Sequence, residues 1–478
     1  DNMITLHEKI EVNRPIEEAF AYVADFRTSE EWDSTVISAS KLSSGPIGNG
    51  TRFEVICRQP LGSFTFGYTL THHEPCKVLK LHGKGRFFDV HDEIRFAETA
   101  TGTHIDYRAT FIFKAYLARL AALFQKGLQQ MGYDSVQGLK RALEDDFPAP
   151  VLSASGRWGE KLVVPAILDF TRLGFNKGRK RWLPVSRWMG DKHVVITGAS
   201  AGLGLAAAKR LAELGAELTL VIRNESKALE LKKVIERETG NSRIHIEIAD
   251  LALMADVERL VQRMNQAGKP IDVLVNNAGA LFNPREETPE GLEQSFALLL
   301  LSPFRLTEGL QPLLLKAGNA RVVNVVSGGM YSQRLDLDRL EAPVENYSGS
   351  VAYARAKRGL MIVTEEWAKA WKKDNIVVNA MHPGWAKTPG VESALPTFNR
   401  LTGPVLRTPE QGADTIVWLA TASEAAKVSG GLFLDREPRT THLMASTRET
   451  PPERATLMES LKTYRPGASS AAYQAIAS

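Results

Sequence analysis

Two patterns of hydrophobic and polar residues divide the chain. In the first, residues 3–12 alternate between apolar and charged side chains, as expected for a strand with one buried face. A short helical stretch follows Pro15 at 16–23, and apolar side chains recur at helical spacing through 116–144. Between them lie β-branched and aromatic runs at 51–58, 64–72, 78–82, 92–97 and 103–113. This part is predicted to be α+β, with one long helix packed on a curved antiparallel sheet.

In the second pattern, short runs typical of buried strands alternate with helical stretches. The predicted strands are 193–197, 217–222, 244–248, 273–275, 321–326 and 376–381. Consecutive runs are separated by enough residues for a crossover helix, which is the arrangement of a doubly wound parallel sheet. We therefore expect an α/β domain of the Rossmann type.

The domain boundaries follow from these patterns. We expect an N-terminal domain over residues 1–147, a linker over 148–190, the α/β domain over 191–445, and a C-terminal tail over 446–478. Prolines break the linker, and basic residues alternate there with tryptophan and phenylalanine. Such a segment suits an anionic membrane surface or a partner groove. Aromatic residues in a linker also dock on a neighbouring domain, which is the interpretation that we favour.

Length and composition limit the class of protein. A chain of 478 residues is too long for a single hydrophobic core, so more than one domain is expected. The 44% apolar and 24% charged fractions are those of a globular protein. A formal net charge of +4 does not suggest a nucleic-acid partner. Two cysteines and no signal-peptide pattern predict a cytoplasmic protein, with membrane contact only at its periphery, and no run of 18 apolar residues predicts a spanning helix. No pattern predicts an oligomeric state.

Three glycines follow the first strand of the second pattern. Gly198, Gly202 and Gly204 stand between the buried run 193–197 and an alanine-rich helical stretch. Glycine is needed where a strand turns tightly into a helix and where the backbone approaches a pyrophosphate, which the free amides of the first helical turn then face. A glycine-rich turn without a ligand is the alternative. We predict a phosphate-binding turn.

The residue after the next strand suggests which dinucleotide binds. Arg223 follows the run 217–222, and Ile222 stands where an acidic residue would bind a ribose 2′-hydroxyl. A guanidinium suits a 2′-phosphate through paired hydrogen bonds, so NADP is favoured over NAD. An arginine on the surface without a ligand is the alternative.

Further polar and small residues lie at the remaining strand ends. Asp250, after the third strand, can place its carboxylate near the adenine edge. Asn277, Ala278 and Gly279, after the fourth strand, form a turn of small residues where the backbone can pass close to the cofactor. Pro383 and Gly384, after the sixth strand, can pass their backbone beside the nicotinamide carboxamide. The residues expected to bind the cofactor are Gly198, Ser200, Gly202, Leu203, Gly204, Arg223, Asp250, Leu251, Asn277, Ala278, Gly279, Tyr353, Lys357, Pro383 and Gly384.

The candidate catalytic residues are Ser327, Tyr353 and Lys357. Ser327 follows the run 321–326, and a helix places Tyr353 and Lys357, four residues apart, on one face. Tyrosine alone is a poor acid–base catalyst because its pKa is about 10. A neighbouring ammonium would lower that pKa, while Ser327 could hold the substrate oxygen. A surface pair on a helix is the alternative.

Together these motifs resemble the short-chain dehydrogenase/reductase family over about residues 190–435, and 429–438 is similar to its dehydrogenase/reductase member twelve subgroup. The resemblance implies that Tyr353 is the general acid or base, that Lys357 lowers its pKa and positions the ribose, and that Ser327 orients the substrate. One position departs from the family, which usually has an asparagine in the helix after the fourth strand to hold a relay water. Here Leu299 stands at that position.

The first part of the chain resembles a second family. Residues 11–20, with Asp25 and Trp32, resemble the START-like polyketide cyclase/dehydrase and lipid-transport superfamily. The resemblance implies that sheet and helix enclose an apolar cavity, without catalytic residues shared across members. The histidines of this part, His72, His73, His82 and His91, match no ligand spacing, so no metal site is expected.

Two functions are compatible with these patterns. The first is an NADP-dependent oxidoreductase that interconverts a carbonyl and an alcohol on a hydrophobic small molecule, fused to an apolar-ligand domain. The second is a non-catalytic lipid-binding protein whose reductase-like domain senses NADP(H). Leu299 favours the second, because it removes the usual relay residue. Ser327, Tyr353 and Lys357 favour the first, which is the function that we expect.

Overall fold

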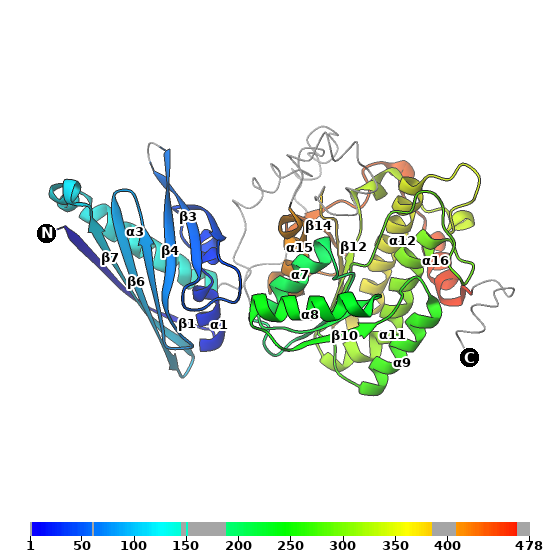
Figure 1. The fold of residues 1–478 in the computed structure, drawn as a ribbon. Coiled ribbons are helices and arrows are strands. Elements are labelled where there is room, and N and C mark those ends of the chain that lie inside the picture. Colours follow the sequence, from blue (N-terminus) through cyan, green and yellow to red (C-terminus); the bar gives the residue numbers. More distant parts are fainter. Residues whose placement is uncertain (1, 60–61, 145–149, 152–187, 385–407, 466–478) are drawn as a thin grey trace. The chain divides into compact units, whose positions relative to one another are not determined.

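The fold was analysed in a computed structural model, which describes residues 2–59, 62–144, 150–151, 188–384 and 408–465. The described residues form two compact units, one around each of two sheets (Figure 1). Most of the predicted basic and aromatic linker, residues 152–187, lies outside the described residues, as does the end of the C-terminal tail. None of the helices in the described ranges is long and apolar enough to cross a membrane.

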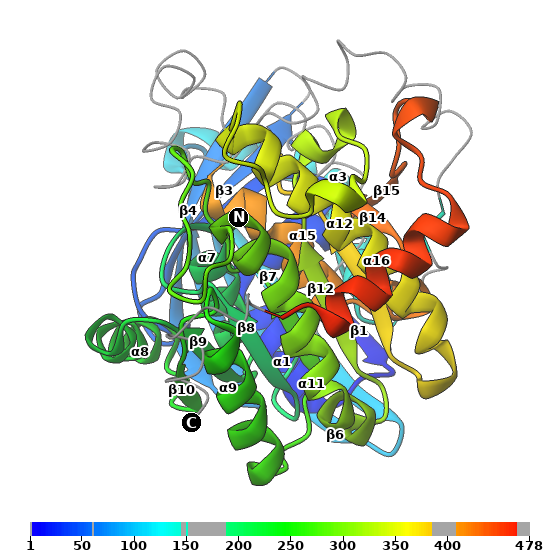
Figure 2. The same cartoon turned by 90° about the vertical axis from the view of Figure 1, so that its right-hand side faces the viewer.

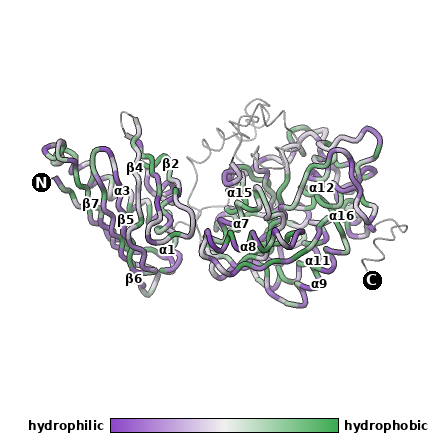
Figure 3. The backbone as a smooth tube through the Cα atoms, in the orientation of Figure 1, coloured by the Kyte–Doolittle hydropathy of each residue, from purple (hydrophilic) through white to green (hydrophobic). Residues whose placement is uncertain are grey.

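A seven-stranded antiparallel sheet forms the N-terminal unit, in the order β1-β7-β6-β5-β4-β3-β2. Burial alternates along β1, because successive side chains point to opposite faces of the sheet. The hydropathy along these strands can be followed in Figure 3. The strands are β1 (Met3–Val12), β2 (Val36–Lys41), β3 (Arg52–Gln59), β4 (Gly62–Glu74), β5 (Val78–Lys84), β6 (Phe88–Thr99) and β7 (Gly102–Phe113).

The helices of this unit pack on the sheet and on one another. The long helix α3 (Ala121–Glu144) contacts β1, β7 and α2 (Ser29–Trp32), and α1 (Ile16–Ala24) contacts β6 and β7. A Cβ at Gly138 would overlap the carbonyl oxygen of Trp32, and one at Gly132 would lie 2.6 Å from a methyl group of Leu6. These glycines lower helix propensity, but they let α3 approach its neighbours closely. Short 3₁₀ helices are η1 (Phe26–Thr28) and η2 (Ala115–Leu120).

The second unit is built on an eight-stranded sheet in the order β10-β9-β8-β11-β12-β13-β14-β15. All neighbouring strands pair in parallel except β14 and β15. β8 and β11 are buried along their whole length, as expected for a sheet covered on both faces. The strands are β8 (His193–Thr197), β9 (Glu217–Ile222), β10 (Ile244–Ile248), β11 (Val273–Asn276), β12 (Arg321–Val325), β13 (Val377–Met381), β14 (Leu432–Leu434) and β15 (Glu437–Arg439).

Helices cover both faces of this sheet (Figures 1 and 2). On one face α7 packs against α15, and on the other α9 packs against α11, with α12 against β12 and β13. These and the remaining helices are α7 (Gly202–Glu213), α8 (Glu225–Thr239), α9 (Met254–Ala267), α10 (Gln294–Phe296), α11 (Ser302–Ala317), α12 (Gly349–Ala370), α15 (Pro409–Thr421) and α16 (Pro451–Thr463). The predicted fold class, an antiparallel sheet with a long helix and a doubly wound parallel sheet, is confirmed.

The structure differs from the predicted elements at the sheet edges. β2 was not predicted; it is an edge strand with serine at two of six positions and an irregular register beside Val36. β14 and β15 were also missed, because three residues each are too short to show a period. The predicted helix at 116–144 begins as the 3₁₀ helix η2 and becomes α-helical at Ala121.

The close approach of α3 gives a test of its packing. Gly138→Ala should destabilise the N-terminal unit by about 1–3 kcal/mol, because its methyl group would displace the Trp32 backbone. Gly127→Ala is the matched control, since a Cβ there meets no atom within 4 Å and should stabilise the helix by about 1 kcal/mol. Hydrogen exchange of peptides from residues 2–144, followed against urea concentration, measures both. Equal effects at the two positions would contradict the close packing.

Candidate active site

The glycine turn lies between β8 and α7. Gly198 and Gly202 adopt φ values of +67° and +58°, which favour glycine. A Cβ at Gly204 would overlap the carbonyl oxygen of Gly198 and the side-chain amide of Asn277. The first turn of α7 has neither a capping side chain nor an acidic residue, so its backbone amides are left for a ligand. The turn therefore has the shape and polarity of an anion-binding cradle.

Hydrogen bonds tie this cradle to the loop after β11. The Thr197 hydroxyl accepts hydrogen bonds from the backbone amides of Asn277 and Ala278, at 3.0 and 2.9 Å. The Asn277 side-chain amide donates in return to the carbonyl oxygens of Thr197 and Gly198, at 3.3 and 3.1 Å. A Cβ at Gly198 would lie only 2.7 Å from the Cα of Ala278. Two of the predicted cofactor segments are thus held against each other by their backbones.

A chain of buried polar side chains lies beneath this edge of the sheet. The Asn276 side-chain amide donates to Thr307 at 2.9 Å and to the Asn324 side-chain oxygen at 2.8 Å. Asn324 donates in turn to the Thr364 hydroxyl at 2.9 Å. This polar chain joins α11, β11, β12 and α12. Sequence reasoning missed it, although an asparagine inside the apolar run of β12 was a visible signal.

Tyr353 and Lys357 lie on one face of α12. Lys357 is only 3% exposed, and its Nζ lies 5.7 Å from the centroid of the Tyr353 ring. That Nζ donates a hydrogen bond to the carbonyl oxygen of Val325, at 2.8 Å, at the end of β12. Lys357 is therefore internal and Tyr353 is partly buried, which argues against the alternative of two residues on a helix surface.

The pKa values of this pair correct one expectation. Burial lowers the pKa of Lys357 to about 8 and raises the pKa of Tyr353 to about 12. We expected the Lys357 ammonium to lower the pKa of Tyr353. In this structure the loss of solvation dominates, and the ammonium is engaged by Val325. Tyr353 therefore carries its proton at neutral pH.

Ser327 lies at the turn after β12. Its hydroxyl oxygen accepts a hydrogen bond from the amide of Gly329 at 3.2 Å, at the start of η4 (Gly328–Ser332). A Cβ at Gly329 would lie 3.5 Å from that oxygen and 3.7 Å from the Cβ of Ala354, the residue after Tyr353. The Ser327 turn thus packs against the first turns of α12.

Leu299 lies in a π-helical turn, η3 (Ala297–Leu301), that joins α10 to α11. It is fully buried, and a Cβ at Gly279 would lie 3.0 Å from its methyl group and 3.8 Å from the Lys357 Nζ. The predicted replacement of the usual asparagine by leucine therefore falls beside the candidate catalytic lysine. π-Helical turns are frequent at functional sites.

A cavity of about 10 Å³ borders Leu299 and Lys357. Two polar atoms of its lining residues, the side-chain oxygens of Asn276 and Ser302, have no hydrogen-bond partner in the structure. A cavity of this volume has room for about one water molecule. Asn276 and Ser302 thus bring two polar atoms without a partner to a cavity that also borders Lys357.

The remaining predicted residues lie at the same edge of the sheet, because the carboxyl ends of parallel strands coincide. Arg223 is exposed just beyond β9. The Asp250 carboxylate accepts from the Ala252 amide at 3.0 Å, and Leu251 lines the small cavity. No described contact brings Ser200, Leu203, Arg223, Pro383 or Gly384 together with Tyr353 or Lys357. Within the described ranges, no three His, Cys, Asp or Glu residues are grouped to hold a metal ion.

The N-terminal unit contains a larger cavity, of about 780 Å³. Aliphatic and aromatic side chains make up most of its lining, and many of them come from the sheet and from α3. The apolar cavity implied by the sequence resemblance is therefore present in this unit.

Comparisons with known proteins agree with both halves of this description. Residues 192–397 match the short chain dehydrogenase family, and residues 3–144 match the polyketide cyclase / dehydrase and lipid transport family. Dehydrogenase/reductase SDR family member 12 of Bos taurus is 38% identical over 316 residues, which are 65% of this chain and 98% of the relative. Polyprenol dehydrogenase of Homo sapiens is 31% identical over 296 residues, 60% of this chain and 88% of the relative.

Solved structures are similar to about half of the chain. A short chain dehydrogenase from Escherichia coli, complexed with NADPH, is 26% identical and covers 53% of this chain and 100% of its own, with a TM-score of 0.44. L-sorbose reductase from Gluconobacter frateurii, complexed with NADPH and L-sorbose, is 24% identical over 51% of this chain and 95% of its own, with a TM-score of 0.42. On the extent of the matches to its curated relatives, the chain belongs to the short-chain dehydrogenase/reductase family of oxidoreductases.

Proposed function

We propose that the protein is an NADP-dependent oxidoreductase that interconverts a carbonyl and an alcohol on a hydrophobic small molecule. One observation carries this proposal: the Tyr353–Lys357 pair lies at the sheet edge where the glycine cradle opens. In a doubly wound sheet, that edge is the place where a dinucleotide and its substrate bind.

The residues of the cradle fit a dinucleotide. Gly198 and Gly204 leave no room for side chains, and the uncapped first turn of α7 faces a phosphate with free amides. The exposed guanidinium of Arg223, just beyond β9, supports a 2′-phosphate and so NADP over NAD. When bound, the nicotinamide supplies or accepts the hydride.

Tyr353 and Lys357 have different roles in proton transfer: Tyr353 donates the proton, and Lys357 restores it. With a pKa of about 12, Tyr353 is protonated at neutral pH and can donate to a substrate carbonyl oxygen, as a reductase requires. Lys357, with a pKa of about 8, exchanges protons readily near neutral pH and can restore the phenol proton. Ser327 orients the substrate oxygen from the neighbouring turn.

We further propose that water in the small cavity supplies Lys357 with protons in place of the usual asparagine route. Asn276 and Ser302 provide two polar atoms there without other partners, and Lys357 lines the same cavity. Such a site gives a water molecule the two or more polar partners that it needs.

A hydrophobic substrate is supported by two observations. Several curated relatives carry the names polyprenol dehydrogenase and retinol dehydrogenase. The fused N-terminal unit contains an apolar cavity large enough for a small molecule. The second candidate function is a lipid-binding protein that senses NADP(H) without turnover, which the fully buried Leu299 favours.

Replacing the candidate acid separates these two functions. Tyr353→Phe should lower NADPH-dependent turnover by at least about 100-fold while NADPH binding persists, because only the acidic proton is lost. NADPH oxidation over a panel of apolar aldehydes, ketones and quinones measures turnover, and nicotinamide fluorescence measures binding. Tyr133→Phe, an exposed tyrosine of α3, is the control. Turnover that persists in Tyr353→Phe would refute the assignment, and no turnover in the unaltered protein would favour the sensor.

The cofactor preference is tested at Arg223. Arg223→Ser should raise the Kd for NADPH about tenfold to a hundredfold, because hydrogen bonds to a charged group contribute about 1.5–3 kcal/mol. The Kd for NADH, which lacks the 2′-phosphate, should stay the same and is the internal control. Titrations of reduced-nicotinamide fluorescence measure both. An equal loss for the two cofactors would assign Arg223 a structural role instead.

The relay proposal is tested at Ser302. Ser302→Ala should lower kcat about fivefold, because one hydrogen bond contributes about 1 kcal/mol, with KM and the NADPH Kd unchanged. The solvent deuterium isotope effect on kcat should increase, which a change in packing alone would not cause. Ser295→Ala is the control, a buried serine of α10 that does not line the cavity. An unchanged kcat and isotope effect would contradict the relay.

A further inference from the structure

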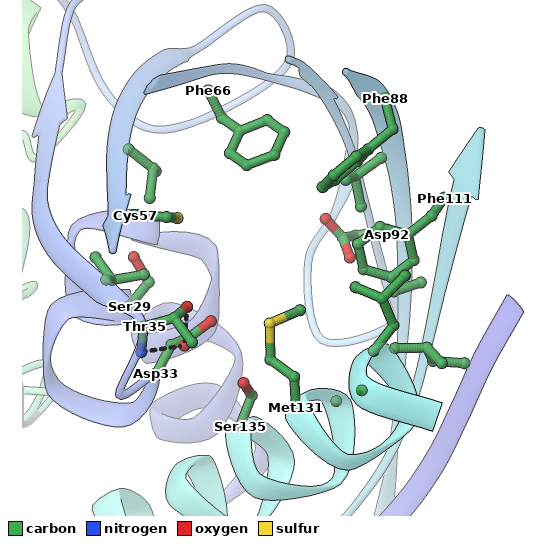
Figure 4. A pocket seen from close by; sticks show the side chains of 18 of the residues that line it. Ser29, Asp33, Thr35, Cys57, Phe66, Phe88, Asp92, Phe111, Met131 and Ser135 are labelled. Carbon is green, nitrogen blue, oxygen red and sulfur yellow. Dashed lines mark hydrogen bonds between the residues drawn. The ribbon is translucent and has the colours of Figure 1, made fainter. Parts of the chain in front are cut away.

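The cavity of the N-terminal unit has an apolar body. Its walls include Phe66, Phe88 and Phe111 from three strands of the sheet, with Met131 from α3 across from them (Figure 4). A space of about 780 Å³ lies within the 300–1,000 Å³ typical of small-molecule sites. Most of a ligand that fills it would therefore be hydrocarbon.

Three carboxyl groups interrupt this apolar lining, those of Glu8, Asp33 and Asp92. Asp33 and Asp92 lie on different walls of the cavity (Figure 4). The Asp33 carboxylate already accepts hydrogen bonds from the backbone amide and the hydroxyl of Thr35, at 2.9 and 2.7 Å. Asp92, on β6, is 4% exposed and receives a hydrogen bond from Tyr107, but its Oδ2 has no partner. Among the described residues that line this cavity, Asp92 thus provides a buried carboxyl oxygen that lacks a hydrogen-bond donor.

The charges around the cavity restrict what can supply that donor. Glu8, Asp33 and Asp92 all line it, and the basic residue among the described lining residues, Arg58, has an exposed side chain. A fatty acid would bring a fourth carboxyl group into this environment. An ether or an aldehyde would bring no donor. An ammonium would bring a charge that needs several acceptors at once, whereas a hydroxyl needs only one acceptor and adds no charge.

We infer that this cavity binds a long-chain apolar alcohol, whose hydroxyl group donates a hydrogen bond to the Oδ2 of Asp92. The inference about binding depends on the cavity alone. That the alcohol is also the reduced partner of the C-terminal reaction rests on the proposed function. The cavity would then retain the alcohol and discriminate against the corresponding aldehyde.

The titration of Asp92 supports this arrangement. The pKa of Asp92 is raised to about 7, chiefly by burial and also by the Asp33 charge, while the hydrogen bond from Tyr107 opposes the rise. A donor from a ligand would stabilise the carboxylate in the same way as Tyr107 does. A ligand hydroxyl therefore offsets part of the desolvation cost of this group.

Four ligands with one hydrocarbon chain test the inference. Dodecan-1-ol, dodecyl methyl ether, dodecanoic acid and dodecylamine compete with Nile red for the full chain, in the absence of NADP(H) and at about pH 8.5, above the pKa of Asp92, where its carboxyl group can only accept. The alcohol should bind about tenfold more tightly than the ether, because one hydrogen bond to a charged group contributes about 1.5 kcal/mol or more. Equal binding of alcohol and ether, or tightest binding of the acid or the amine, would overturn the inference.

Variants locate the site. Asp92→Leu should abolish the difference between alcohol and ether, and Asp92→Asn, which keeps the shape of the side chain, should reduce it if the leucine variant does not fold. Asp89→Leu is the matched control on the same strand, since its carboxylate pairs with Lys114 and does not line the cavity. Met131→Trp should fill the cavity and abolish binding. Binding that survives Met131→Trp would place the ligand elsewhere and refute the inference.

These outcomes are independent of catalysis. The binding assay contains no cofactor, so an inactive reductase would not change it. Conversely, loss of the alcohol preference in Asp92→Leu with NADPH oxidation intact would support the cavity site and leave the proposed reaction standing.

Discussion

The arrangement of the C-terminal site depends on the hydroxyl group of Thr197. It accepts hydrogen bonds from two consecutive backbone amides of the loop after β11, and the Asn277 side chain returns two hydrogen bonds to the cradle. Backbone segments that are 80 residues apart in sequence are thereby held in contact. Because Gly198 and Gly204 have no side chains, nothing separates these segments. The contact between the glycine cradle and the loop after β11 would therefore fix where a bound cofactor places both its phosphate and its nicotinamide ring.

Burial, rather than charge, governs the ionisable pair of α12. Loss of solvation shifts the pKa of Lys357 downward and that of Tyr353 upward, so each group moves toward its neutral form. The neutral phenol keeps its proton for a substrate, and the lysine titrates close to physiological pH. Leu299 is fully buried beside Lys357 and is one of the apolar side chains that surround it.

Much of the fold could be predicted from the sequence, for a physical reason. Strands buried on both faces, such as β8, appear as unbroken apolar runs, and strands with one buried face, such as β1, alternate. The glycines of the cradle were visible because side chains are excluded there. β2, β14 and β15 were not predicted, since their pairing comes from neighbouring strands more than from their own pattern. The roles of Asn324 and Ser302 depend on packing between helices and strands, which sequence spacing does not show. The pKa of Tyr353 depends on burial in the same way.

The buried polar chain from Thr307 through Asn276 and Asn324 to Thr364 has a consequence for how this protein can change over evolution. Both asparagines take part in two contacts of the chain, so an apolar replacement at either would leave buried polar groups without a partner. These contacts link two strands and two helices. A substitution at one of the four residues is therefore tolerated only when its hydrogen-bond partners change as well. Sequences related to this one should therefore vary at these four positions as a set, while the apolar positions around them drift independently.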